Sequence, residues 1–209
     1  VIASQHALST SSLPSIVNSA LRDDPTVYVR LRSGNLDECF GLLLSRQADV
    51  AIVYHVPDEP DEISEDFLET LDIGQDRLIP VSDVVVAALI TMAGAEVEMP
   101  IVTYPADVFL GKVMADKIIP VLPSNLIANS RAETALTFAA LEMAAGGVAV
   151  AWVPASVAQP HLDAGRVVDL SAHLPSCPLV IRAVRLASKP GPAETVLWRQ
   201  LMQLAKTWA

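Results

Sequence analysis

The chain has 209 residues, of which 52 % are hydrophobic and 18 % are charged, and its net charge at pH 7 is −10. This composition supports a sizeable folded core and excludes a mainly disordered chain. The acidic balance, with Lys and Arg scattered along the sequence, also argues against DNA binding by this chain itself, because phosphate contacts need clustered cations.

The first part of the chain alternates predicted strands with amphipathic helices. Apolar residues of the first helix recur at helical spacing, and Pro14 fits its first turn, where a missing N–H is harmless. Asn35 and Glu38 have the spacing of a capping box that starts the second helix. We predict strands at 1–4, 27–31 and 49–54 and helices at 13–21 and 36–46. This order predicts an α/β fold with a parallel sheet covered by helices.

The pattern continues into a second lobe. Residues 57–66 carry six acidic residues and two prolines, which favours a solvated loop. Residues 68–81 predict an extended strand pair that crosses into the second lobe, and residues 167–170 predict the return. The remaining predicted elements are strands at 101–104, 126–128, 148–153 and 178–186, and helices at 83–92, 107–118, 131–145, 155–164 and from Pro192. Two lobes joined by two crossovers enclose a cleft, the usual position of a small ligand.

Three stretches in a fixed order carry a family resemblance. The first is Ile2-Ala3-Ser4-Gln5-His6-Ala7-Leu8 leading into Leu13-Pro14, and the second is Ala48-Asp49-Val50-Ala51-Ile52-Val53. The third is Met143-Ala144-Ala145-Gly146-Gly147-Val148-Ala149-Val150-Ala151-Trp152-Val153-Pro154, which predicts a helix end, a glycine stop and a buried strand. Over nearly the whole chain this order resembles the effector-binding domain of LysR-type transcriptional regulators, although Gly146-Gly147 replaces the family's usual Gly-x-Gly.

The resemblance implies a fold of the type 2 periplasmic-binding-protein kind, with two Rossmann-like lobes joined by two crossover strands. Lobe one, or regulatory subdomain I, would comprise 1–78 and 168–209, and lobe two, or regulatory subdomain II, 79–167. An effector, which we expect to be an organic anion, would bind in the inter-lobe cleft. A winged helix-turn-helix domain absent from this chain would bind DNA. The resemblance also implies cytoplasmic homodimers paired through the lobe-one helices, and tetramers of the full-length protein.

The turn from His6 to Ser12 is the first candidate ligand site. Its four consecutive hydroxyls and the backbone N–H groups of a helix start can hold an anion, or they can simply cap their own helix. The residues alone leave these alternatives about even. The resemblance places the effector against His6, Ala7, Leu8 and Ser9. Because Ala7 stands where the family often has a hydroxyl, we expect the hydroxyl contact at Ser9.

Two further candidate positions follow later strands. Asn35 has a structural role as a helix cap, and the resemblance adds a ligand contact. Tyr104, Val108 and Phe109 form either an apolar wall of the site or part of a helix core. Arg131, at the predicted start of the helix at 131–145, has a guanidinium group that suits a carboxylate, although a surface arginine is the alternative.

Other functions were weighed against this interpretation. A transporter's solute-binding protein shares the fold but needs export. The chain shows no signal peptide, but this does not decide between the two functions, because we expect the start of the chain to be truncated. No apolar run is long enough for a membrane span. An oxidant-sensing regulator of the same family is a second alternative. Its characteristic methionine is replaced by Leu110 before Gly111, with Met114 one turn later. Cys39 falls inside a predicted helix, which favours a buried thiol; a disulfide or redox switch involving Cys39 and Cys177 is the alternative.

Enzymatic function finds little support in the sequence. It contains no Gly-x-Ser-x-Gly elbow, phosphate-binding loop or His-Glu-x-x-His motif. The four histidines have no metal-ligand spacing. We therefore expect no catalytic residues, no metal and no cofactor.

Overall fold

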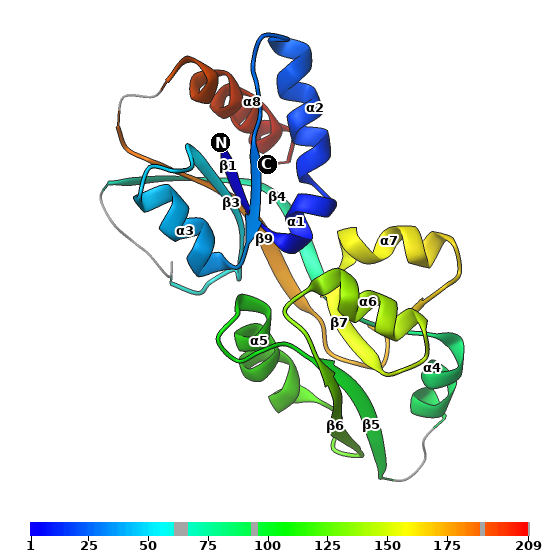
Figure 1. The fold of residues 1–209 in the computed structure, drawn as a ribbon. Coiled ribbons are helices and arrows are strands. Elements are labelled where there is room, and N and C mark those ends of the chain that lie inside the picture. Colours follow the sequence, from blue (N-terminus) through cyan, green and yellow to red (C-terminus); the bar gives the residue numbers. More distant parts are fainter. Residues whose placement is uncertain (61–66, 93–95, 189–190, 209) are drawn as a thin grey trace. The chain divides into compact units, whose positions relative to one another are not determined.

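The computed structural model describes residues 1–60, 67–92, 96–188 and 191–208, without the side chains of Thr207 and Trp208. It divides into two compact units (Figure 1). Unit 1 comprises Val1–Asp76 and Leu179–Ala209, and unit 2 comprises Arg77–Pro178. Within the described residues, no helix is both long and apolar enough to cross a membrane.

Unit 1 is built around β1 (Ile2–Gln5), which lies between β2 (Leu31–Gly34) and β3 (Val50–His55) and runs parallel to both. All residues of β1 are buried, as are the first five of β3, which matches the apolar sequence of a covered parallel sheet. β9 (Cys177–Leu186) pairs antiparallel with β3, and β4 (Leu68–Ser82) follows β9 in the strand order. The helices are α1 (His6–Thr10), α2 (Leu13–Asp23), α3 (Leu36–Leu44) and α8 (Pro192–Trp208).

Unit 2 continues with the strand order β4-β7-β5-β6, and β8 pairs with β4. β5 runs parallel to β6 and β7, whereas β7 is antiparallel to β4. Its strands are β5 (Val97–Thr103), β6 (Leu126–Glu133), β7 (Val150–Pro154) and β8 (Val168–Asp169). Its helices are α4 (Val84–Thr91), α5 (Phe109–Val113), the π-helix η1 (Met114–Ile118), the 3-10 turn η2 (Ile119–Val121), α6 (Thr137–Ala145) and α7 (Ala155–Asp163).

The glycine pair between α6 and β7 confirms the predicted helix stop. Gly147 has a φ of 73°, in the left-handed region that favours glycine, whereas Gly146 keeps an ordinary negative φ. A Cβ on Gly147 would lie 3.2 Å from a carboxylate oxygen of Asp83. The Asp83 carboxylate accepts a hydrogen bond from the Val86 N–H (2.9 Å) and so caps α4, as the sequence predicts.

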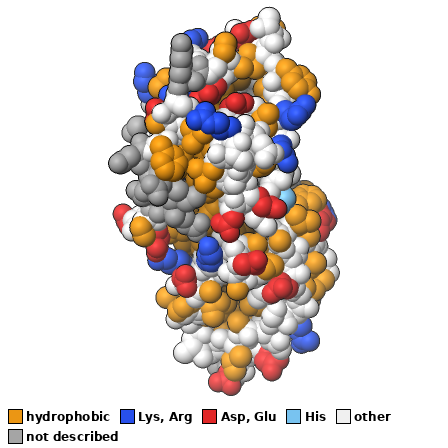
Figure 2. Space-filling view, turned by 60° about the vertical axis from the view of Figure 1, so that its left-hand side comes forward, with side chains coloured by type: hydrophobic (Ala, Val, Ile, Leu, Met, Phe, Trp, Pro, Cys, Tyr) orange, Lys and Arg blue, Asp and Glu red, His pale blue; other side chains and the backbone are white. Residues whose placement is uncertain are grey.

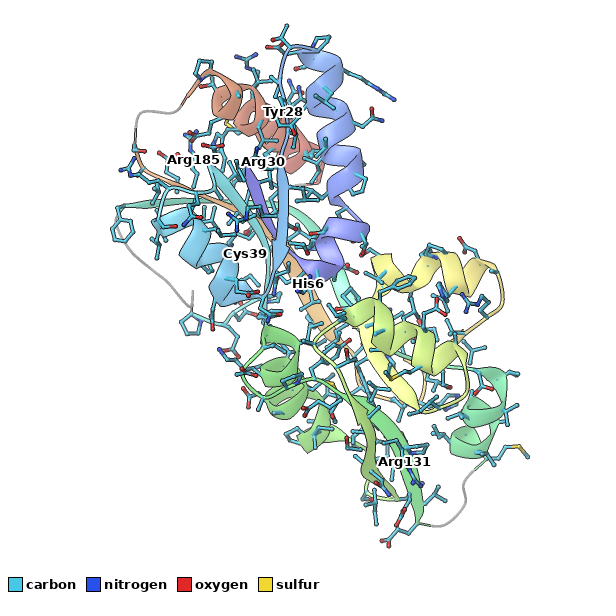
Figure 3. All side chains as sticks on the ribbon, in the orientation of Figure 1. His6, Tyr28, Arg30, Cys39, Arg131 and Arg185 are labelled. Atoms are coloured by element: carbon cyan, nitrogen blue, oxygen red, sulfur yellow. The ribbon has the colours of Figure 1, made fainter. Side chains whose placement is uncertain are left out.

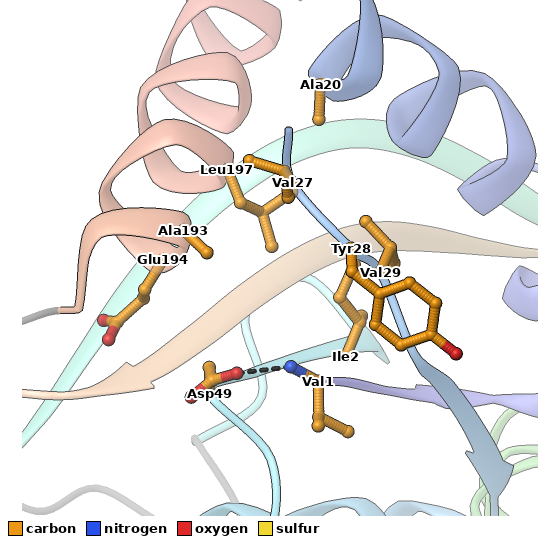
Figure 4. Close-up of a pocket in the computed structure, with 10 residues that line it drawn as sticks. All are labelled: Val1, Ile2, Ala20, Val27, Tyr28, Val29, Asp49, Ala193, Glu194 and Leu197. Atoms are coloured by element: carbon orange, nitrogen blue, oxygen red, sulfur yellow. Dashed lines mark hydrogen bonds and ion pairs between the residues drawn. The ribbon is translucent and has the colours of Figure 1, made fainter. Parts of the chain in front are cut away.

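The strand predicted at 27–31 is wrong in position, because β2 begins only at Leu31. The partner strand β1 starts at Ile2, which pairs with Leu31, so the preceding residues have no strand beside them. Their alternating burial is nevertheless real. Val27 and Val29 are half-buried and line a cavity of about 30 Å³ with Ala20 and Leu197 (Figure 4), whereas Tyr28, at its border, is 81 % exposed.

Two other predicted elements are corrected. The strand pair expected at 68–81 is the single strand β4, and the helix expected from Arg131 begins at Thr137. Arg131 lies in β6, because β6 stays paired with β5 as far as Thr103 and Glu133. This strand pairing extends β6 through the residues that we assigned to the start of the helix.

The boundary between the units passes through two long strands. It falls between Asp76 and Arg77 within β4, and between Pro178 and Leu179 within β9. The predicted return at 167–170 differs from this division, because Val168 and Asp169 pair with β4 inside unit 2. In the predicted acidic loop, Asp58 and Glu59 are exposed, and residues 61–66 lie outside the described part of the chain.

Candidate functional site

Polar side chains meet where the parallel strands of unit 1 end. Gln5 pairs with Gly34, and Ser4 pairs with Ile52, so β1, β2 and β3 reach their carboxyl ends at one edge of the sheet. In parallel α/β sheets this edge is where ligands bind. We call Gln5, His6, Ser33, Asn35 and Tyr54 the carboxyl edge of unit 1.

His6 connects the ends of two strands at this edge. Figure 3 shows His6 at the start of α1. Its Nδ1 lies 2.8 Å from the hydroxyl oxygen of Ser33, the penultimate residue of β2. The ring is half-buried, and Nε2 makes no hydrogen bond with another described residue. The structure therefore brings His6 to the same edge as Asn35, and adds Ser33, which the sequence analysis missed.

Asn35 occupies the predicted N-cap position of α3. Its backbone N–H donates to the Glu38 carboxylate over 2.6 Å, which confirms the predicted capping box. A Cβ on the preceding Gly34 would lie 2.8 Å from the same Glu38 oxygen, so the box itself favours glycine there. The half-buried Asn35 thus has a structural role, and its contact with an effector stays a prediction.

The other predicted residues of this turn lie in α1, a short helix where we expected a loop. Ala7 and Leu8 are buried, with exposed fractions of 4 % and 0 %. The Ser9 hydroxyl donates to the backbone oxygen of Gln5 (3.2 Å). The hydroxyls of Thr10 and Ser11 both donate to the Ala7 backbone oxygen (2.9 and 3.0 Å). These bonds favour the interpretation that the hydroxyls cap their own chain.

Gln5 is the polar residue that the sequence analysis overlooked. Its side-chain oxygen accepts a hydrogen bond from the backbone N–H of Tyr54 over 2.6 Å, and the Tyr54 hydroxyl donates to Asp76 over 2.8 Å. Gln5 lies between the strand predicted at 1–4 and the turn predicted from His6, so we assigned it no role. One signal could have identified Gln5: it is a polar residue at the end of a strand that is buried on both faces.

In unit 2, the predicted apolar wall belongs largely to the core. Tyr104 is 5 % exposed and its hydroxyl donates to the Trp152 backbone oxygen over 2.9 Å. Burial raises the pKa of the Tyr104 hydroxyl well above its usual range. Phe109 is buried in α5, and Val108 is half-buried before it. Their positions favour the core interpretation.

Arg131 is exposed and lies at an irregularity of β6. Ile101 pairs with Ser130 and Val102 with Ala132, so Arg131 is the extra residue of a β-bulge. The helix start from which we inferred its ligand role is therefore absent at this position. Beside it, the Thr103 and Ser130 hydroxyls lie 2.9 Å apart.

Both thiols are buried, and the described metal-binding side chains form no cluster of three. Both cysteines are free and buried, which confirms the buried thiol predicted at Cys39. Burial raises the pKa of Cys39 to about 12, so it carries little thiolate. Met114 is 3 % exposed. Within the described ranges, no group of three His, Cys, Asp or Glu side chains is placed to hold a metal ion.

An ionic cluster joins α6, α7 and the turn after α7. The Glu142 carboxylate pairs with Arg166 (2.7 Å) and with the His161 Nε2 (2.8 Å). The Arg166 hydrogen bond, followed by that from His161, lowers the pKa of Glu142 to about 2. Since the folded state favours the ionised carboxylate, its stabilising contribution is present above pH 4.5, the ordinary pKa, and is lost as the pH falls toward about 2.

Thermal unfolding at several pH values tests this contribution. We expect Glu142→Gln to melt below the wild type near neutral pH, and the difference to shrink as the pH falls through this window. Glu96→Gln removes an exposed carboxylate from the same unit and is the charge control. A melting difference that stays constant down to the lowest pH would contradict the role of the ionised carboxylate.

Comparison with known proteins agrees with this architecture. Residues 1–207 match the LysR substrate binding domain family. The chain is 24 % identical to the HTH-type transcriptional regulator YjiE of Escherichia coli K12, over 97 % of this chain and 64 % of YjiE. The chain thus spans less than two thirds of that relative.

Two solved structures share the fold. The regulatory domain of HypT from Salmonella typhimurium superposes with a TM-score of 0.80 at 20 % identity, covering 99 % of this chain and 94 % of that one. Full-length HypT, described as a hypochlorite-specific LysR-type transcriptional regulator, gives a TM-score of 0.77 at 20 % identity, covering 99 % and 67 %. On its match over nearly its whole length, the chain belongs to the LysR substrate-binding domain family, the effector-binding domains of LysR-type transcriptional regulators.

Proposed function

We propose that the domain senses a small organic anion, and that binding modulates DNA binding and transcription by a longer protein. The observation that carries this proposal is the convergence of Gln5, His6 and Asn35 at the carboxyl edge of unit 1. Family membership supports a regulator over a transporter's solute-binding protein or an enzyme. The resemblance places the effector between lobes one and two, and this placement stays a prediction.

The charge of the chain supports a sensing role rather than direct DNA contact. The net charge is −10, and Figure 2 shows Lys and Arg side chains dispersed among acidic and apolar ones on one face. DNA binding would come from the winged helix-turn-helix of the longer, cytoplasmic protein. The effector would act by its different affinities for two conformations of the regulator, since a ligand only shifts states that are already accessible.

We also propose that two copies pair through unit 1, with tetramers in the longer protein. A groove of about 570 Å³ runs between α2 and the segment before β2, and its lining is mostly apolar. β2 is the outermost strand of its sheet, and Leu31 and Tyr28 are 42 % and 81 % exposed. An open sheet edge beside an apolar groove supports association. The groove is lined by Leu13, Pro14, Val17, Asn18, Leu21, Val27, Tyr28, Val29 and Leu31.

Oxidant sensing is less well supported by the residues of this chain. Cys39 and Cys177 are buried, and Met114, which follows the helix glycine, is nearly inaccessible. Two exposed methionines are Met92, which is 83 % exposed at the end of α4, and Met202, which is 42 % exposed in α8. We therefore retain anion sensing as the proposal and include hypochlorite in its test.

A thermal-shift screen against small carboxylates, aromatic acids, amino acids and hypochlorite tests the proposal, with light scattering reporting the oligomeric state. A ligand at one hundred times its Kd should add about 2.7 kcal/mol of stability. We expect a carboxylate to bind, and Asn35→Ala to weaken its affinity because one polar group leaves the carboxyl edge. If no carboxylate raises the melting temperature, or if hypochlorite alone changes it, anion sensing is contradicted.

The structural role of Asn35 calls for a matched control. Losing an N-cap side chain costs about 0.5–2 kcal/mol of stability, so Asn35→Ala lowers the melting temperature whether or not Asn35 touches ligand. Asp83→Ala removes the cap of α4 in unit 2 and should lower the melting temperature while leaving the ligand Kd unchanged. If Asn35→Ala and Asp83→Ala bind the ligand with equal Kd values, Asn35 is not part of the site.

A further inference from the structure

The helix α4 exposes apolar side chains as well as burying them. Val86, Ala87 and Ile90 belong to the core of unit 2, with exposed fractions of 5–8 %. The other side of the helix is also apolar, and its four large side chains are 63–83 % exposed. A helix that is apolar all round is normally covered on both sides. We call these exposed residues the outer face of α4: Val84, Val85, Ala88, Leu89 and Met92.

The outer face has the spacing of a helix–helix contact. From Val85 to Met92, its residues stand at positions i, i+3, i+4 and i+7, so they form one stripe along the helix. The exposed Thr91 lies beside this stripe, and its hydroxyl donates to the Ala87 backbone oxygen over 2.9 Å. A stripe of this kind packs well against an equivalent stripe on another helix.

The charges around α4 favour a second copy of the chain over a lipid surface. No residue from Val84 to Met92 is charged, and the nearest described charged residues along the chain, Asp83 and Glu96, are acidic. Helices that lie on membranes carry Lys and Arg on their polar face, which α4 lacks. Two copies of a chain with net charge −10 repel each other, so their contact requires an uncharged surface such as this one.

We infer that the outer face of α4 is an interface for a second copy of this chain, with the two α4 helices packed antiparallel about a two-fold axis. Leu89 lies near the middle of the stripe and would meet its own counterpart. Such a contact is self-complementary, because the same residues stand on both sides. The inference goes beyond the proposed function, since it adds an interface in unit 2 to the pairing proposed through unit 1.

The small size of the outer face predicts a weak contact. A stable interface buries about 800 Å² on each partner, which is more than five side chains of a two-turn helix supply. We therefore expect a Kd of about 0.1–1 mM for this contact alone. When unit 1 already holds two chains together, the contacts reinforce one another. The outer face would then link dimers into the tetramers proposed for the longer protein.

Sedimentation equilibrium of the 209-residue chain at concentrations up to about 1 mM tests the inference. We expect the wild type to assemble beyond the dimer, and Val85→Glu to assemble at least about 10-fold more weakly, because two carboxylates are brought into the contact. A glutamate suits the first turn of a helix, so α4 should stay folded. Val121→Glu makes the same change at a valine with nearly the same exposure, 61 % against 63 %, in η2 of unit 2. It should assemble as the wild type does.

A charge exchange identifies the partner as a second α4. Leu89→Glu and Leu89→Lys should each assemble more weakly than the wild type, because like charges meet at the centre of the contact. An equimolar mixture of the two variants should recover the wild-type assembly, because opposite charges then meet. If the mixture assembles no better than either variant alone, Leu89 does not face its counterpart and the inference is overturned.

The contact in unit 2 is separated from that in unit 1 by Tyr28→Glu, which places a charge in the unit-1 groove. This variant should form dimers that Val85→Glu then abolishes. If Val85→Glu and the wild type have the same mass at every concentration, the α4 interface is overturned, whatever the result for Tyr28. If the wild type floats with phosphatidylcholine vesicles and Val85→Glu does not, the outer face binds lipid and the inference is also overturned.

Discussion

Trp152→Ala is expected to lower the free energy of unfolding of unit 2 by about 3–5 kcal/mol. The side chain is fully buried in β7, and its Nε1 donates to the Pro175 backbone oxygen over 2.8 Å. Its backbone oxygen accepts from the Tyr104 hydroxyl. Removing the indole leaves a large cavity in a close-packed core and an unsatisfied carbonyl beside it. Urea unfolding followed by circular dichroism measures the loss.

Trp152→Phe separates packing from hydrogen bonding. It retains a ring in the core but removes the Nε1 donor, so we expect a smaller loss, of about 1–3 kcal/mol. If the alanine and phenylalanine variants lose the same free energy of unfolding, the hydrogen bond to Pro175 accounts for most of the contribution of Trp152. If alanine costs less than about 1 kcal/mol, the indole does not hold unit 2 together.

Gly111→Ala is expected to destabilise unit 2 by about 1–3 kcal/mol, because the added methyl group meets backbone rather than a movable side chain. The new Cβ would lie 2.0 Å from the Pro105 carbonyl oxygen, so the turn between β5 and α5 must shift. Thermal unfolding of the variant and of the wild type measures the effect.

Gly41→Ala is the control with the opposite sign. Gly41 lies within α3, is exposed, and a Cβ built there meets no atom within 4 Å. Alanine should stabilise this helix by about 0.5–1 kcal/mol, because glycine loses more conformational freedom on folding. A stabilising Gly111→Ala, or two substitutions with equal effects, would contradict the close approach of α5 to the Pro105 carbonyl.

Local patterns in the sequence predicted the elements whose signals are complete within a few residues. The capping box at Asn35, the cap at Asp83 and the stop at Gly147 each need only nearby backbone, and all three are confirmed. The errors occurred where a distant partner decides. β2 starts at Leu31 because β1 begins at Ile2, and α6 starts late because β6 remains paired with β5.

The candidate site was less predictable than the fold, for the same reason. His6 and Asn35 could be placed at strand ends, and the structure puts both at one edge. The hydrogen bond from the Tyr54 N–H to the Gln5 side chain joins residues 49 positions apart, so no local sequence pattern predicts it. Arg131 was assigned to a helix start, but the pairing of β6 with β5 on both sides of it makes it the extra residue of a bulged strand.

The two strands that pass through the unit boundary set the order in which the two units can fold during synthesis. Unit 2 is one continuous stretch, whereas unit 1 lacks β9, its strand between β3 and β4, until the segment that follows unit 2 has been synthesised. During synthesis unit 2 can close first, while β3 exposes an unpaired edge. Until β9 (Cys177–Leu186) is made, that edge is free to pair with other chains, so β9 protects the nascent protein from aggregation.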